Sequence, residues 1–76
     1  MTFIEFKESW LEEPKRTHER KGQSLINHLH GIWLDEYKRL SSVHYYKETN
    51  IDCYFNDDLI ENTLTHLKKV WINYPN

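Results

Sequence analysis

The sequence predicts an all-α fold, a small three-helix domain, because helix-start signals and apolar spacing agree in three segments. A capping signature opens the chain at Thr2 and Glu5. Apolar residues of helical period fill residues 25–40, and a second set fills residues 60–71 after a cluster of acidic side chains. Such spacing is typical of helices that pack one face against a core. No internal repeat or linker divides the chain, so residues 1–76 are expected to form a single domain.

The first helix is expected to begin after Thr2. The Thr2 hydroxyl can accept a hydrogen bond from the amide of Glu5, and the Glu5 carboxylate can reach back to the amide of Thr2. Three aromatic residues then recur on one face: Phe3, Phe6 and Trp10. Pro14 lacks an amide donor, so the helix is expected to end near Glu12 or Glu13.

The central helix is predicted from a long apolar stripe: Leu25, Ile26, Leu29, Ile32, Trp33, Tyr37 and Leu40. Gly31 costs about 1 kcal/mol relative to alanine inside a helix. We therefore expect a kink or a break between Gly31 and Asp35, with Asp35 as the cap of a short following helix. Thr17 can cap the start of the central helix, or Gly22 can separate a basic loop from it.

Residues 41–56 lose the helical period and are expected to form an irregular loop rich in aromatic and acidic side chains, with one short extended piece. Asn56, Asp57 or Asp58 is expected to cap the last helix, and Asp58 and Glu61 repeat the capping-box spacing. The apolar stripe of that helix is Ile60, Leu64, Leu67 and Trp71. The residues predicted to form the core are Trp10, Leu29, Leu64 and Leu67.

Composition favours a protein that binds. The chain has 76 residues, three Trp, five Tyr and three Phe, more aromatic surface than so small a core is expected to enclose. Exposed apolar surface implies a partner, either another protein or a second copy of the chain. The net charge of −2 argues against both a general nucleic-acid coat protein and an acidic DNA mimic.

The segment Asp52–Asp58 is the strongest candidate for a chemical site. Its clustered oxygens suit a divalent cation, but the spacing is not that of an EF-hand loop, and helix capping explains the same residues. Cys53 has no neighbouring base, and the five histidines lack zinc-ligand spacing. We therefore expect no enzyme activity, no metal and no cofactor. A minimal metal protein or enzyme around Asp52–Asp58 is the last alternative.

The basic segment 15–21 supports an alternative function in nucleic-acid binding. Its four cations could contact phosphates, and Tyr45 and Tyr46 could add stacking. Acidic segments on both sides argue against it, and a solvated or internally paired basic loop explains the same residues. No apolar run is long enough to span a bilayer, and a single cysteine fits a reducing compartment, so an intracellular protein without membrane contact is expected.

Four segments carry a resemblance to known proteins: Thr2–Phe6, Arg20–Gln23, Asp52–Asp58 and Leu67–Trp71. Together they resemble a group of short accessory proteins encoded by tailed bacteriophages. The resemblance implies a viral protein made in the host cytoplasm, where such domains commonly bind and redirect a host protein. It implies no catalytic residues.

We therefore expect a phage accessory protein that binds and modulates a host protein, in host takeover or counter-defence, without catalysis of its own. Anchors at protein interfaces are typically Trp, Tyr and Arg. The side chains expected to contact the partner are Arg16, Arg20, Lys21, Trp33, Tyr37, Tyr45, Tyr46 and Tyr54.

Overall fold

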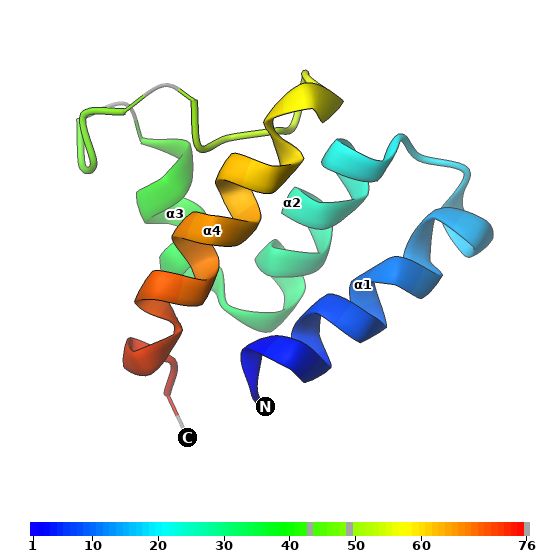
Figure 1. Cartoon of the computed structure of the whole chain (residues 1–76), viewed down its shortest axis with the longest axis horizontal. Coiled ribbons are helices and arrows are strands. Elements are labelled where there is room, and N and C mark those ends of the chain that lie inside the picture. The colour runs from blue at the N-terminus through cyan, green and yellow to red at the C-terminus, as the bar shows by residue number, and fades with distance from the viewer. Residues whose placement is uncertain (43, 49, 76) are drawn as a thin grey trace.

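The computed structural model describes residues 1–42, 44–48 and 50–75, without the side chains of residues 13–17. Six helical elements follow one another along the chain (Figure 1): α1 (Phe3–Thr17), α2 (Lys21–Ile32), α3 (Leu34–Ser41), the 3-10 helix η1 (Asp57–Leu59), α4 (Ile60–Val70) and the 3-10 helix η2 (Trp71–Asn73). No strand occurs in the described residues. The all-α class is confirmed, with four α-helices where three were expected.

The predicted start of α1 is confirmed, and its predicted end is wrong. The amide of Glu5 donates to the Thr2 hydroxyl at 3.1 Å, and the amide of Thr2 donates to Oε1 of Glu5 at 2.8 Å. α1 then continues through Pro14 to Thr17. Proline holds φ near the helical value, so within a helix it removes one hydrogen bond without forcing the chain to stop. His18 follows with a left-handed φ of 61°, a common way for a helix to end.

The central helix is broken at Trp33, which separates α2 from α3. Trp33 has φ −142° and ψ 78°, outside the helical range. Its amide still donates to the carbonyl of Leu29 at 2.7 Å, and its carbonyl accepts from the amide of Tyr37 at 3.0 Å. The break lies in the expected interval, but Trp33 and not Asp35 occupies the N-cap position of α3. Asp35 lies in the first turn of α3, where the positive end of the helix dipole stabilises a negatively charged carboxylate.

α2 begins at Lys21, and no side chain of its own segment caps it. Arg20 is the N-cap residue and makes no capping bond, while Thr17 belongs to α1. The free amide of Gly22 instead donates to Oδ1 of Asp57 at 3.0 Å. A distant part of the chain therefore caps α2.

The start of the last helical segment is capped by Asn56. Its Oδ1 accepts from the amide of Asp58 at 2.9 Å, and η1 then leads into α4. Asn56 is one of the three candidates expected from the sequence; the other two, Asp57 and Asp58, do not provide this cap, and Asp57 turns toward α2. The described part of the preceding loop is irregular, as expected, and the Thr63 hydroxyl of α4 donates to the carbonyl of Ile51 at 2.7 Å.

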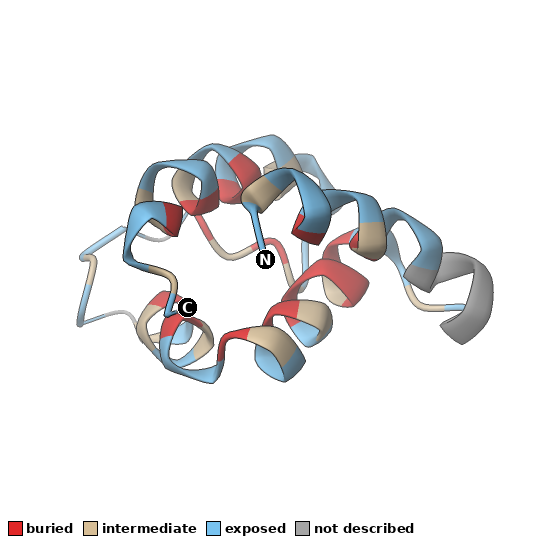
Figure 2. Cartoon of the chain, turned by 90° about the horizontal axis from the view of Figure 1, so that it is seen from below, coloured by how far each residue is buried: buried red, intermediate tan, exposed pale blue. Residues whose placement is uncertain are grey.

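The helices enclose one core. Figure 2 shows the buried faces of the helices turned toward a shared interior. The four residues predicted from the apolar stripes are all buried, which confirms that prediction: Trp10, Leu29, Leu64 and Leu67. The Cα radius of gyration of 11.5 Å matches the value of about 11.4 Å expected for a compact chain of this length.

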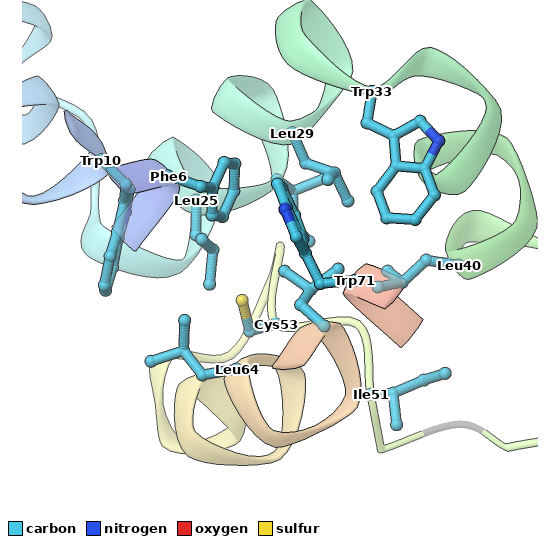
Figure 3. Packing of buried hydrophobic residues seen from close by; sticks show 12 residues of the cluster. Phe6, Trp10, Leu25, Leu29, Trp33, Leu40, Ile51, Cys53, Leu64 and Trp71 are labelled. Atoms are coloured by element: carbon cyan, nitrogen blue, oxygen red, sulfur yellow. The ribbon is translucent and has the colours of Figure 1, made fainter. Parts of the chain in front are cut away.

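Trp71 lies at the centre of an aromatic cluster (Figure 3). Its ring centroid is 4.9 Å from that of Phe6, 5.2 Å from that of Trp33 and 4.8 Å from that of Tyr74. Its indole nitrogen donates to the carbonyl of Met1 at 3.0 Å. This bond holds the first residue of the chain against η2, the last helical element.

Candidate functional site: the turn at Phe55

Residues 52–58, hereafter the Phe55 turn, form a tight turn that is held from within. The amide of Asn56 donates to the carbonyl of Cys53 at 3.2 Å. Oδ1 of Asp52 accepts from the amide of Tyr54 at 3.0 Å, an Asx turn. Together with the Asn56 cap, these bonds fix the backbone on both sides of Phe55.

The Phe55 turn is also fastened to the N-terminus of α2. Arg20 donates from Nη1 to Oδ1 of Asp57 at 3.1 Å and from Nη2 to the carbonyl of Tyr54 at 2.7 Å. Asp57 accepts from the amide of Gly22 as well. A carboxylate at this position meets the positive end of the helix dipole and a guanidinium at once, so attraction to α2 holds the turn in place.

Cys53 forms the buried base of the turn. Its thiol is fully buried, points into the core (Figure 3) and donates to the carbonyl of Gly22 at 3.5 Å. Burial raises the pKa of the Cys53 thiol. A buried thiol with a raised pKa is a poor nucleophile, so Cys53 packs the turn against α2.

Phe55 projects from this turn into solvent. Its side chain is 86% exposed, although it is one of the largest apolar side chains in the protein. Its only described ring contact is an edge contact with Tyr54, with centroids 4.7 Å apart. The turn therefore presents an uncovered aromatic ring on a backbone that is fixed by at least five hydrogen bonds within it and to α2.

The predicted contact residues lie in two separate places. Tyr54 belongs to the Phe55 turn, and Arg20 donates a hydrogen bond to its carbonyl. The exposed Lys21 follows Arg20 directly in the sequence. Tyr45 and Tyr46 lie on the other side of the loop, against α3 and α4. The predicted set is therefore not one continuous surface.

Two further predicted contact residues are not free surface residues. Trp33 is only 4% exposed, so its expected position on the surface is wrong: the break between α2 and α3 turns the indole toward Trp71 and Tyr74. Tyr37 is half-buried and makes an edge contact with His30 at 4.6 Å between centroids. The side chain of Arg16 lies outside the described residues.

The nucleic-acid alternative loses part of its basic surface in the structure. Arg20 is engaged by Asp57 and by the carbonyl of Tyr54. Among the described side chains of the basic segment, Lys21 is exposed and forms no ion pair. Nucleic-acid binding stays an alternative without a specific observation in its favour.

Sequence reasoning missed a buried polar cluster around Glu36, which is 1% exposed. Its carboxylate accepts from Arg39 Nε at 2.9 Å, from the Tyr46 hydroxyl at 2.7 Å and from His66 Nε2 at 2.9 Å. A carboxylate only accepts, so Nε2 of His66 carries the proton. One sequence feature indicates that Glu36 is buried: it lies three residues after Trp33 and four before Leu40, within the apolar stripe of the central helix.

The protonation of this cluster is set by its hydrogen bonds. Burial works against the charged form of Glu36, but the bonds from His66, Tyr46 and Arg39 outweigh it and lower the pKa of Glu36. Burial and the neighbouring carboxylate raise the pKa of Tyr46 to about 12. The cluster joins α3, the loop and α4, and its three donors satisfy the carboxylate, so its role is a structural link.

Two of the three acidic residues of the Phe55 turn, Asp52 and Asp57, are engaged in hydrogen bonds within the turn and to the start of α2. Among the described residues, no three His, Cys, Asp or Glu side chains gather in a way that could hold a metal ion. Asp52 and Asp57 accept backbone and guanidinium donors instead. Within the same residues, no helix combines the length and apolarity that a bilayer crossing requires.

Comparisons of the chain with protein-family models, curated proteins and solved structures gave no match. The geometry of the Phe55 turn is therefore the main support for a functional proposal.

Proposed function

We propose that this protein is a small phage accessory protein that binds and modulates a host protein in the host cytoplasm, without catalysis of its own. The observation that carries the proposal is the exposed ring of Phe55 on a rigid turn. The phage context comes from the resemblance of four short segments to accessory proteins of tailed bacteriophages.

The energetics of Phe55 favour a role in binding. Full burial of a phenylalanine side chain is worth about 1.5–3 kcal/mol relative to exposure, and the folded chain leaves nearly all of that gain unused. A partner that covers the ring would recover it. The turn is already ordered, so binding costs less conformational entropy than it would for a flexible loop.

The test compares two exposed apolar side chains. Phe55→Ala removes the proposed anchor, and Ile4→Ala is the matched control, because Ile4 is 66% exposed on α1. A host protein captured from bacterial lysate by the wild type is purified, and its affinity for each variant is measured by calorimetry. We expect Phe55→Ala to weaken binding about 30-fold, the effect of losing a 2 kcal/mol anchor, and Ile4→Ala to change it less than about twofold.

Equal affinities of the two variants for the captured protein would contradict the proposal. Unchanged circular dichroism and melting temperature of Phe55→Ala would show that the loss is not one of folding. If the wild type is a dimer by light scattering and Phe55→Ala is a monomer, the partner at this ring is a second copy of the chain.

A further inference from the structure

A second surface next to the Phe55 turn has the properties of a docking groove. A hollow of about 360 Å³ opens between α1 and α4, hereafter the α1/α4 groove. Its apolar lining comes from both helices: Trp10 and Leu11 of α1, Ile60 and Leu64 of α4. Trp10 and Leu64 are buried beneath it, while Leu11 remains exposed at its edge. Apolar surface therefore remains uncovered between two helices.

The two walls of the groove carry opposite charges. Lys7 and Lys21 line the wall formed by α1 and the start of α2. Asp58 and Glu61 line the wall formed by η1 and α4. All four side chains belong to exposed residues. Asp57 also lines the groove, but its charge is matched by Arg20.

We propose that the α1/α4 groove binds an amphipathic helix of the protein partner. Its apolar stripe covers Leu11 and Ile60, its acidic flank lies along Lys7 and Lys21, and its basic flank lies along Asp58 and Glu61. This inference rests on the proposed function and specifies the chemistry of the partner. Asp57 belongs to both the Phe55 turn and the groove lining, so one partner can contact both.

The charge pattern selects this occupant over others. A helix laid in a groove inserts side chains of an i, i+3, i+4, i+7 stripe and presents two different flanks to the walls. A nucleic-acid backbone or an anionic membrane would meet Asp58 and Glu61 with like charge, which disfavours binding. A helix with opposite flanks satisfies both walls at once.

The test uses three designed peptides as probes, independent of any natural partner. All carry the same leucine stripe at helical spacing; the first has glutamates on one flank and lysines on the other, the second only glutamates, and the third only lysines. Affinities are measured by fluorescence anisotropy of labelled peptides. We expect the mixed peptide to bind the wild type about tenfold more tightly than either uniform peptide, since each uniform peptide meets one wall of like charge.

Reversing one wall gives the decisive measurement. In the double variant Lys7→Glu, Lys21→Glu both walls are acidic, so we expect the all-lysine peptide to become the tightest binder. The matched control is Lys38→Glu, Lys68→Glu, which makes the same change in net charge at exposed residues outside the groove lining. The control should keep the wild-type order of affinities.

Three results would overturn the inference: no saturable binding of any peptide, equal affinity for all three, or an unchanged order in the Lys7→Glu, Lys21→Glu variant. A purely structural role of the lysines cannot reverse a preference between peptides. Phe55→Ala should leave peptide binding unchanged, because the ring is outside the groove lining. A failure of the groove and a failure of the Phe55 anchor are therefore distinguishable.

Discussion

At position 22 the packing of two backbones leaves no room for a side chain. A Cβ atom at Gly22 would overlap the carbonyl oxygen of Cys53 and lie 2.7 Å from Oδ1 of Asp57. The same backbone segment donates to Asp57 and accepts from the Cys53 thiol. Glycine is thus required here for close approach of the Phe55 turn to α2.

Gly22→Ala should destabilise the protein by about 1–3 kcal/mol, the range found when extra atoms are forced into packed sites. Gly31→Ala is the control, because a Cβ at Gly31 meets nothing within 4 Å. Inside α2 that change should stabilise by about 0.5–1 kcal/mol. Urea unfolding measures both, and equal effects of the two substitutions would show that the turn does not pack closely on α2.

Between elements, the Glu36 cluster links α3, the loop and α4. Glu36 and Arg39 belong to α3, Tyr46 to the loop and His66 to α4. Arg39 also lies over the rings of Trp33 and Tyr45, at 5.6 and 5.9 Å from their centroids. One carboxylate thereby fixes the position of the loop relative to two helices.

Glu36→Gln should cost about 3 kcal/mol of stability at pH 7, because an amide presents a donor to groups that also donate, and breaking a buried pair has a cost of this size. The exposed control Glu61→Gln should change stability by less than about 0.5 kcal/mol. Chemical unfolding at neutral pH measures both variants.

The pH dependence of this effect follows from the lowered pKa of Glu36. Because the folded protein lowers the pKa of Glu36, the ionised carboxylate stabilises the fold. This stabilisation is fully present at a pH above 4.5, the ordinary pKa of a glutamate, and it is lost as the pH falls through the lowered pKa. The stability gap between wild type and Glu36→Gln should therefore narrow below about pH 4.5. A gap that stays constant from pH 7 to pH 3 would contradict the ionic role of Glu36.

At the scale of the whole molecule, a single aromatic and aliphatic core supports every helix. Leu29 lies on α2 and Leu67 on α4, and both are fully buried beside Trp71 in one cluster. A chain of 76 residues buries only about 60–65% of its unfolded surface, so its margin of stability is small. Loss of one core side chain therefore affects the entire fold.

Leu29→Ala should destabilise the protein by about 2–5 kcal/mol, the usual cost of a cavity at a buried leucine. Leu34→Ala, at an exposed position of α3, is the matched control and should change stability by less than about 0.5 kcal/mol. Thermal unfolding followed by circular dichroism compares the two. An unchanged melting temperature for Leu29→Ala would mean that the buried face of α2 is misassigned.

The sequence alone determined the helical class, the start of α1, the interval in which the central helix breaks and the inward faces of the helices. These features depend on local rules: the Thr2 and Glu5 capping box, the glycine near the break, and apolar spacing of three and four residues. Each rule acts within one or two helical turns, so neighbouring residues contain the information.

Only the tertiary structure decided which side chains are available to a partner. The sequence predicts Asp57 as a cap of its own helix, but in the fold its carboxylate accepts from the amide of Gly22 and the guanidinium of Arg20 at the start of α2. The sequence predicts Trp33 as a partner-binding residue on the surface, but the break between α2 and α3 turns its ring toward Trp71. Phe55 is exposed on a turn that a distant segment, at Arg20, holds in place. Such outcomes depend on contacts between residues far apart in the chain, which spacing within one segment does not encode.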